Sequence, residues 1–347
     1  MPPSITTREP RLDRERLIRE LVPPPRFDAE RFATYRPDPE QPSQSAAVRR
    51  LEEYAAGLAD GERGGSGGDR RWWRRGSAKP QQAQGVYLDG GFGVGKTHLL
   101  ASLWHASPGP KAFGTFVEFT NLVGALGFAQ TVAALQGHRL VCIDEFELDD
   151  PGDTLLMSTL LTRLSEAGVA LAATSNTLPG ALGEGRFAAE DFLREIQALS
   201  ARFDVLTVDG EDYRHRGLAP SPPPLSDEEV AARVVEAGGL CDHFVDVTRH
   251  LATVHPSRYR ALLDGVTAVG WQHVRPVSDQ MVALRLVVLA DRLYDADIPV
   301  FASGHPLGDI FTPELMRGGY RKKYFRAVSR LTALAREGVG EVAHGQG

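Results

Sequence analysis

The chain has 347 residues, which suggests two domains or one large domain with appendages, and 42% of them are hydrophobic, enough for at least one sizeable core. Charged residues at 24% and aromatic residues at 8% are ordinary for a globular protein. The formal net charge of −6 argues against a surface that attracts nucleic acid over its whole extent, although it allows a local basic patch.

Cysteine content and hydropathy indicate the cellular compartment of the protein. The two cysteines are Cys142 and Cys241, and Cys142 lies in an apolar run, so a disulfide framework is not expected. No apolar run approaches the roughly 18 residues that a membrane span needs. The charged N-terminus, Met1 to Glu20, lacks the apolar centre of a secretory signal. We therefore expect a soluble, cytoplasmic protein without a membrane span.

The first 83 residues are predicted to form an arm, a helix and a linker. Frequent prolines up to about residue 40 indicate an arm lying on the body or a disordered tail. Apolar residues at helical spacing predict a helix over 43–58, capped by Ser43, which completes an N-terminal segment 1–60. A glycine-rich run and the stretch Arg70-Arg-Trp-Trp-Arg-Arg75 predict a flexible linker over 61–83.

From residue 84 to 217 the pattern is that of an ATPase core, with strands alternating with helices. Strands are predicted at 85–88, 113–119, 138–143, 169–173 and 203–208. Helices are predicted at 96–104, 153–167 and 191–200. This alternation indicates an α/β fold with a parallel sheet that helices cover on both faces.

The proline-rich segment 218–225 marks a boundary, and the rest of the chain, 218–347, is predicted to be a smaller C-terminal α/β unit. Helices are expected at 227–236, 279–294 and 323–337, and strands at 243–247, 270–277 and 298–302.

A phosphate-binding motif lies between the first strand and the first helix of the core and matches G-x-x-x-x-G-K-T. Its glycines let successive N–H groups converge on one point, and the following helix adds its dipole there. Lys96 is expected on the β- and γ-phosphates, and the Thr97 hydroxyl on Mg²⁺. A chance glycine turn is disfavoured because the required strand and helix flank the motif. The predicted ATP-binding residues are Gly90, Gly91, Phe92, Gly93, Val94, Gly95, Lys96 and Thr97.

Two acids follow the apolar strand that ends at Ile143. Asp144 is predicted to bind Mg²⁺ and Glu145 to orient and deprotonate the attacking water. Asp144 alone would also fit a helix cap. The second acid favours hydrolytic ATPases over nucleotide kinases, which need no base for water.

The next apolar strand ends in Thr174-Ser175-Asn176. Because this strand is expected beside the strand of Asp144, the Asn176 amide is predicted to reach the γ-phosphate or the attacking water, the role called sensor 1. The alternative is that Asn176 only starts a turn before Pro179.

Further short motifs complete an ordered series. After the phosphate-binding motif come Ile143-Asp-Glu-Phe146, Ala173-Thr-Ser-Asn176, Asp212-Tyr-Arg214, Val288-Leu-Ala-Asp-Arg-Leu-Tyr294, Val300-Phe-Ala-Ser303, and Phe325-Arg326 with Ser329-Arg330-Leu331. This series resembles the ZapE cell-division ATPases and their mitochondrial AAA-type relatives over about residues 26–335. The family's arginine-rich "LQRxRF" segment has no match, since Ala189 and Asp191 occupy those positions.

The resemblance implies a Mg²⁺-dependent ATPase that remodels a protein partner and destabilises polymers of the tubulin-like protein FtsZ in cell division and the cell cycle. It also implies that an arginine finger from a neighbouring subunit of a homo-oligomer assists hydrolysis. Arg194 and Arg330 rank ahead within the set Arg186, Arg194, Arg202, Arg214, Arg326 and Arg330.

Other interpretations stay open. A helicase-loader-like ATPase acting on single-stranded nucleic acid is favoured by Arg70–Arg75 and by Arg321-Lys-Lys323, and disfavoured by the net charge and the second α/β unit. A nucleotide-gated scaffold that hydrolyses slowly is a third possibility. Arg70–Arg75 would alternatively be an aromatic anchor within a disordered linker. Gln44 would either contact adenine or be a solvated helix residue. No metal-ligand spacing of histidines or cysteines predicts a zinc site.

Overall fold

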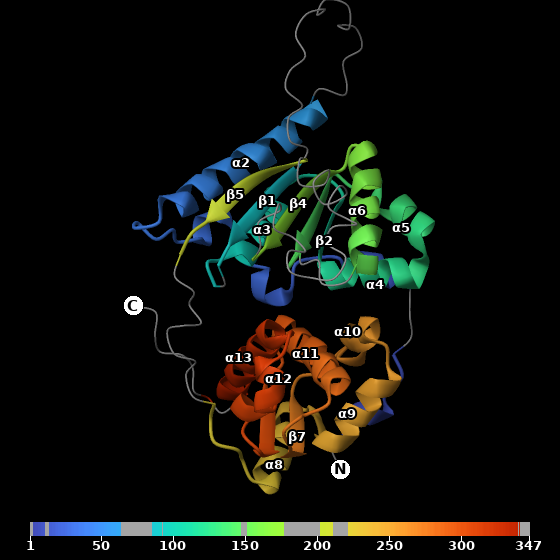
Figure 1. The fold of residues 1–347 in the computed structure, drawn as a ribbon, viewed down its shortest axis with the longest axis vertical. Coiled ribbons are helices and arrows are strands. Elements are labelled where there is room, and N and C mark those ends of the chain that lie inside the picture. The colour runs from blue at the N-terminus through green and yellow to red at the C-terminus, as the bar shows by residue number, and fades with distance from the viewer. Residues whose placement is uncertain are drawn as a thin grey trace, which may run out of the picture. The chain divides into compact units, whose positions relative to one another are not determined.

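The structure is a computed structural model of the chain, and it describes residues 3–10, 14–63, 85–91, 93–146, 151–176, 202–210, 221–338 and 340. The chain divides into two compact units. The P-loop unit consists of Asp13–Pro23 and Phe27–Arg216, and the C-terminal unit of Met1–Leu12, Pro24–Arg26 and Gly217–Gly347. Both are drawn in Figure 1.

Five parallel strands form the sheet of the P-loop unit, in the order β2-β3-β4-β1-β5. They are β1 (Gly85–Gly90), β2 (Lys111–Thr115), β3 (Leu140–Asp144), β4 (Ala170–Ser175) and β5 (Phe203–Val208). The three inner strands, β3, β4 and β1, are almost wholly buried, which explains their continuous apolar sequence. Because β4 lies between β1 and β3, the carboxyl ends of these three strands meet at one edge.

Helices cover both faces of this sheet, as predicted (Figure 1). One face packs against α2 (Pro42–Arg63) and α3 (Lys96–Ala106), and the other against α4 (Phe116–Leu126), α5 (Phe128–Leu135) and α6 (Pro151–Glu166). The strand residues alternate accordingly: Val86 and Leu88 face α2 and α3, whereas Tyr87 faces the opposite layer.

The N-terminal arm packs on the P-loop unit through residues 14–23 and 27–35. It contains α1 (Arg14–Arg19), η2 (Pro25–Phe27) and η3 (Phe32–Thr34). The Leu21 carbonyl accepts a hydrogen bond of 2.8 Å from the Phe113 N–H, and the Leu21 side chain is buried in the core on one face of the sheet. The arm therefore covers part of the outer edge of β2, which would otherwise offer unpaired backbone groups.

The C-terminal unit has a three-stranded parallel sheet in the order β6-β7-β8, made of Leu240–His243, Val269–Val274 and Val300–Gly304. One face packs against α8 (Asp227–Ala237), and the other against a larger set of helices. That set is α9 (Phe244–Thr253), α10 (Tyr259–Leu262), α11 (Gln280–Asp295) and α13 (Arg321–Gly338), with η7 (Pro256–Arg258), η8 (Leu307–Asp309) and α12 (Pro313–Arg317) between them. The predicted smaller α/β unit is therefore confirmed.

The first residues of the chain pack against this C-terminal sheet. The Pro3 carbonyl accepts from the Cys241 N–H at 3.0 Å, and the Ile5 N–H donates to Asp242 Oδ2 at 2.9 Å. Ile5, in η1 (Ile5–Thr7), is buried in the unit's main core. The predicted segments 1–60, 61–83, 84–217 and 218–347 stay predictions, and the structure adds that the arm contributes to both units.

Three predicted strands extend beyond the observed ones, and the strand predicted over 270–277 ends at Val274. The strand predicted over 113–119 ends at Thr115, where α4 begins, because Thr115 and Glu118 form a reciprocal capping box with bonds of 3.2 and 2.7 Å. The strand predicted over 243–247 is wrong from Phe244 onward, where α9 begins. The helix predicted over 191–200 lies outside the described residues.

The predicted cap of α2 is also wrong. The helix begins at Pro42, and the Ser43 hydroxyl accepts a hydrogen bond of 3.0 Å from the Asp209 N–H instead. Ser43 therefore fastens α2 to the segment that follows β5. Within the described ranges, no helix combines the length and the apolar character that crossing a membrane requires.

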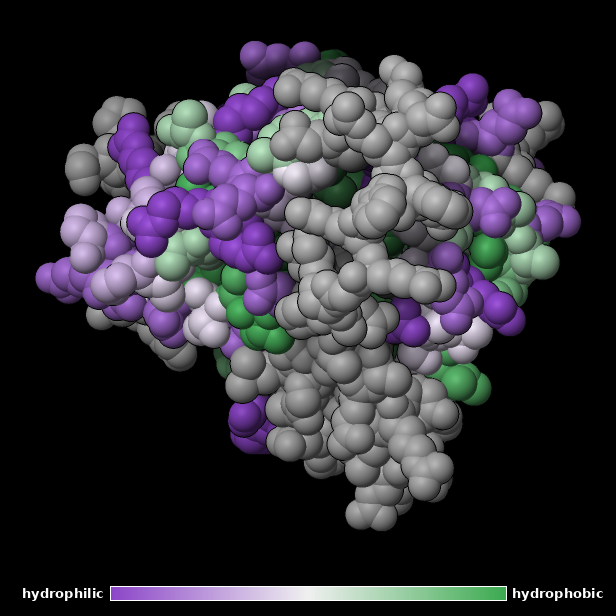
Figure 2. Space-filling model, turned by 90° about the horizontal axis from the view of Figure 1, so that it is seen from above, coloured by the Kyte–Doolittle hydropathy of each residue, from purple (hydrophilic) through white to green (hydrophobic). Residues whose placement is uncertain are grey.

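Hydrophilic residues lie on both flanks of the face that Figure 2 presents, with hydrophobic residues in small separate areas. The exposed large hydrophobic side chains described in the P-loop unit come from four different segments; they are Val22, Val117, Leu155 and Val205. Scattered hydrophobic side chains of this kind are ordinary for a water-facing surface.

Candidate nucleotide-binding site

The phosphate-binding motif forms the turn between β1 and α3, as its spacing predicts. Gly93 and Gly95 have φ angles of 78° and 86°, in the left-handed region that favours glycine. At Gly90 a side chain would place its Cβ 2.2 Å from the Val208 carbonyl oxygen, so the close approach of β1 to β5 also requires glycine. Phe92 lies outside the described residues.

Lys96 starts α3 and is largely buried at 9% exposure. Its ammonium group donates to the Gly90 carbonyl at 2.8 Å, to the Gly91 carbonyl, and to Asn176 Oδ1 at 2.9 Å. The structure thus brings Lys96 and Asn176 together, although they are 80 positions apart in the sequence. Strand β4 makes this possible, because it pairs directly with both β1 and β3, as expected for the strand that carries Asn176.

Asp144, at the end of β3, is 7% exposed and lies within hydrogen-bonding distance of two threonine hydroxyls. Thr97 Oγ1 donates to its carboxylate, with distances of 3.0 Å to Oδ2 and 3.2 Å to Oδ1. Thr174 Oγ1, at the end of β4, donates to Oδ1. The oxygen donors that the sequence assigned to Mg²⁺, Thr97 and Asp144, are therefore adjacent.

Glu145 follows Asp144 in a left-handed backbone conformation, with φ of 53°. Such a conformation is uncommon for residues other than glycine and concentrates at functional sites. The conformation is supported on both sides by Thr174: its hydroxyl accepts from the Glu145 N–H at 3.1 Å, and its carbonyl accepts from the Phe146 N–H at 2.7 Å. Phe146 is buried against the rings of Tyr87 and Phe116. Thr174, near the end of β4, therefore fixes the backbone at Glu145, the residue predicted to activate the water.

Sequence reasoning missed a third acid at this edge. Asp89 is the last residue of β1 before Gly90 and pairs in register with Ser175 and Thr207. Burial raises the pKa of the Asp89 carboxyl above its usual value, and the positive charge of Lys96 opposes that rise. The available signal was a carboxylate at the end of a buried strand, directly before the phosphate-binding motif.

Gln44 is buried rather than solvated, so the solvated interpretation is wrong. Its side-chain amide donates to the Asp209 carbonyl at 2.7 Å and accepts from the Asp38 N–H at 2.8 Å. These bonds link the arm and α2 to the segment after β5, and the adenine contact stays a prediction.

The arginines predicted as finger candidates fall into three groups: two lie in the C-terminal unit, one lies in the P-loop unit, and the others lie outside the described residues. Arg330 pairs with Asp291 at 2.5 Å, and its guanidinium lies 5.1 Å from the Tyr294 ring centroid, within the C-terminal unit. Arg326 pairs with the same carboxylate at 2.8 Å. Arg202 donates to Ser165 Oγ at 3.0 Å. Arg186, Arg194, Arg214 and the stretch Arg70–Arg75 lie outside the described residues.

The donor chemistry of the site fits Mg²⁺. Hydroxyl and carboxylate oxygens are the hard ligands this ion prefers, and it usually takes only one or two carboxylates from the protein, with the rest from phosphates and water. In the part of the chain that the structure describes, no group of three or more His, Cys, Asp or Glu side chains is placed to hold a metal ion. The pair Thr97 and Asp144 matches the sparse protein coordination expected of Mg²⁺ beside a nucleotide.

Comparison with protein families gives one match that spans most of the chain. The family model for AFG1-like ATPases matches residues 12–223 and 218–340. The Cell division protein ZapE of Escherichia coli (strain K12) is 33% identical over 172 residues, which cover 45% of this chain and 46% of that protein. Lactation elevated protein 1 homolog B of Danio rerio is 25% identical over 168 residues, 42% of this chain and 33% of that protein. The chain thus spans about half the length, or less, of these curated relatives.

Among solved structures, DnaI is similar with a TM-score of 0.41 and 16% identity, over 56% of this chain and 97% of DnaI. This likeness is too weak to add to the fold described above.

Proposed function

The chain belongs to the AFG1-like ATPase family, since the family model matches most of its length, and on this premise we propose that it hydrolyses ATP in a Mg²⁺-dependent reaction to remodel a protein partner. The observation that carries the proposal is the convergence of Lys96, Thr97, Asp144 and Asn176 at one edge of the sheet. A cation, an oxygen pair suited to a metal and an amide are the groups that a triphosphate and its attacking water require.

Binding of the triphosphate would use the glycine turn and the start of α3. Backbone N–H groups of the turn and the positive end of the helix dipole favour an anion there. Lys96 Nζ, now bonded to the Gly90 and Gly91 carbonyls, would turn its donors toward phosphate oxygens. Because Lys96 is largely buried, its attraction for phosphate is screened less than that of an exposed lysine.

Thr97 and Asp144 would hold Mg²⁺. When bound, this ion would neutralise charge on the phosphate oxygens. The chain's own contribution is to keep the two ligands in place, and Thr174 does so for Asp144 through its hydroxyl.

Hydrolysis would convert ATP and water to ADP and phosphate. Glu145 would take a proton from the attacking water as its oxygen forms a bond to the γ-phosphorus. The bond between that phosphorus and the bridging oxygen breaks, and its electron pair leaves on ADP. Asn176 would orient the water or the γ-phosphate. We keep Arg194 and Arg330 as candidates for a finger supplied by a neighbouring copy in a homo-oligomer.

We further propose that the partner is FtsZ and that the protein acts in the cytoplasm during cell division. The resemblance of the ordered motifs to ZapE supports this proposal, together with the 33% identity to a protein named for cell division.

Two measurements test the two halves of the proposal. Lys96→Ala and Asp144→Ala should each reduce phosphate release from ATP by at least about a hundredfold, since each removes a charge from the site. Unchanged turnover in either variant would refute the assignment of the ATPase site.

The amount of FtsZ polymer that sediments should fall when the wild-type protein and ATP are added, and should not fall with Lys96→Ala. An ATP-dependent turnover without any effect on FtsZ would reject that partner alone.

A further inference from the structure

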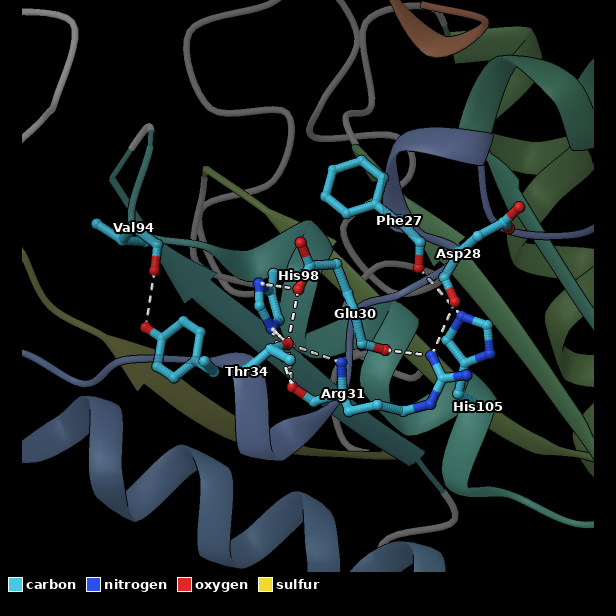
Figure 3. A network of polar contacts seen from close by, with 9 residues as sticks. Phe27, Asp28, Glu30, Arg31, Thr34, Val94, His98 and His105 are labelled. Carbon is cyan, nitrogen blue, oxygen red and sulfur yellow. Dashed lines mark hydrogen bonds and ion pairs between the residues drawn. The ribbon is translucent and has the colours of Figure 1, made fainter. Parts of the chain in front are cut away.

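A short part of the N-terminal arm, residues 27–35, lies along α3 and is called the strap here (Figure 3). His105 Nε2 lies 3.1 Å from the Phe27 carbonyl and must donate, because a carbonyl only accepts. His98, directly after Thr97, places Nε2 3.1 Å from the Arg31 carbonyl. The strap is thereby bonded to two points of the helix that begins with the phosphate-binding lysine.

At its end the strap reaches the phosphate-binding turn itself. The Tyr35 hydroxyl donates to the Val94 carbonyl at 2.8 Å. The Tyr35 ring lies so close to Gly95 that a Cβ added there would stand 2.6 Å from a ring carbon. The same ring meets the His98 ring edge-on, with centroids 5.3 Å apart. Tyr35 is therefore fitted to the turn by both its ring and its hydroxyl.

The hydroxyl contact has a directional consequence. In a trans peptide the carbonyl and the following N–H point in opposite directions, and the described chain has no cis peptide bond. Holding the Val94 carbonyl toward Tyr35 thus turns the Gly95 N–H away from the strap. Phosphate-binding turns work by presenting successive N–H groups to one anion, so the orientation of this peptide matters for the nest.

We propose that Tyr35 is a positioning residue that sets the Val94–Gly95 peptide for phosphate binding. The inference rests on the proposed function, namely that this turn binds the phosphates of a nucleotide. Tyr35 would act on the triphosphate through the peptide and would not read the base. Its loss should therefore weaken every ligand that carries the polyphosphate, because preorganisation of the turn is lost.

The test compares Tyr35→Phe with a matched control in the full chain. Tyr54→Phe also removes one hydroxyl, which donates to the Leu171 carbonyl at 3.4 Å from α2. Calorimetric titration with Mg-ATP and with Mg-tripolyphosphate should show Tyr35→Phe binding both about fivefold more weakly, the usual effect of one hydrogen bond, with Tyr54→Phe within about twofold of wild type. Turnover at saturating ATP should fall far less than affinity.

Each outcome decides a different point. Equal affinities of Tyr35→Phe and wild type would overturn the inference, and weaker ATP binding with unchanged tripolyphosphate binding would assign Tyr35 to the base instead. If Tyr35→Phe reduces the folded fraction, the fitted stoichiometry gives the active fraction and the affinity is still compared. A wild-type protein that binds neither ligand would reject the proposed function itself, which keeps the two failures apart.

Discussion

The two parallel sheets of this protein use their motif residues differently. In the P-loop unit the motif residues Lys96, Thr97, Asp144 and Asn176 meet at the carboxyl edge of the sheet. In the C-terminal unit the motif residue Asp291 on α11 instead binds arginines of α13, and so joins two helices. Motifs of one ordered series thus meet at a sheet edge in one unit and join two helices in the other.

The buried acids show the physical basis of this difference. Asp144 accepts from threonine hydroxyls, which stabilise a carboxylate without neutralising its charge. Asp291 faces two guanidinium groups: burial alone would raise its pKa, but Arg326 and Arg330 bring the pKa below its usual value. A carboxylate stabilised by neutral donors suits a metal site, whereas one neutralised by two arginines suits a structural link.

The carboxyl edge of the C-terminal sheet carries polar residues as well. Ser303 Oγ donates to Asp227, and the other oxygen of Asp227 lies 3.2 Å from His273 Nε2. The carboxylate therefore stands between serine and imidazole, whereas activation of a serine nucleophile needs the imidazole in the middle. Asp227 therefore serves as the matched control for the acids at the carboxyl edge of the sheet in the P-loop unit.

The largest expected effect comes from Glu145→Gln, which removes the base but keeps the shape of the side chain. We expect turnover to fall by about 10²- to 10³-fold while ATP still binds, measured by phosphate release and calorimetry. Asp227→Asn, at the edge of the other sheet, should keep turnover within about twofold of wild type. An equal loss in both variants would break the distinction between the two units.

Asp291→Asn should lower the free energy of unfolding by about 3 kcal/mol at pH 7, because it removes the negative charge that two half-buried guanidinium groups pair with. The native pKa of Asp291 is lowered, so its contribution is present above the unfolded pKa and is lost as pH falls through the native value. Urea unfolding at neutral and acidic pH should therefore show that the difference in the free energy of unfolding between Asp291→Asn and wild type becomes smaller in acid.

Arg330→Gln sharpens the same point, since Arg330 is both a partner of Asp291 and a candidate finger. A packing role predicts a loss of stability similar to that of Asp291→Asn, with ATP turnover that tracks the folded fraction. Loss of turnover in fully folded Arg330→Gln would identify a finger and weaken the comparison.

Thr174→Val should reduce turnover by about tenfold, because it removes a donor to Asp144 and an acceptor for the Glu145 N–H in a side chain of nearly the same shape. ATP affinity should change by less than about twofold. Thr174→Ser keeps the hydroxyl and should restore turnover. Equal rates for the valine and serine variants would contradict the positioning role.

The smallest effect concerns Asp89, whose carboxylate would repel phosphate when ionised. Its pKa is raised, so Asp89→Asn should tighten ATP binding by about twofold at pH 8, and the difference should vanish as pH falls through that pKa. Calorimetry across this range checks the sign. Weaker binding by the asparagine variant at pH 8 would show that Asp89 supports the site instead.

The spacing of residues over short stretches of the sequence determined much of the secondary structure of this protein. The glycine and lysine pattern predicted the turn between β1 and α3, and the alternation of apolar runs predicted a parallel sheet with helices on both faces. These features could be predicted because each depends on residues close together in the chain. The capping box of Thr115 and Glu118 was equally local, and its signal was present but overlooked.

Other features depended on the path of the chain through space. Tyr35 meets Val94 across 59 positions, and Arg330 meets Asp291 across 39. No spacing rule covers such pairs, because their contact depends on how separate elements pack. The sequence by itself therefore predicted which residues would hold phosphate and activate water. Only the tertiary structure decided that Tyr35 is fitted to the turn, that Thr174 supports both acids, and that Arg330 is bonded to α11.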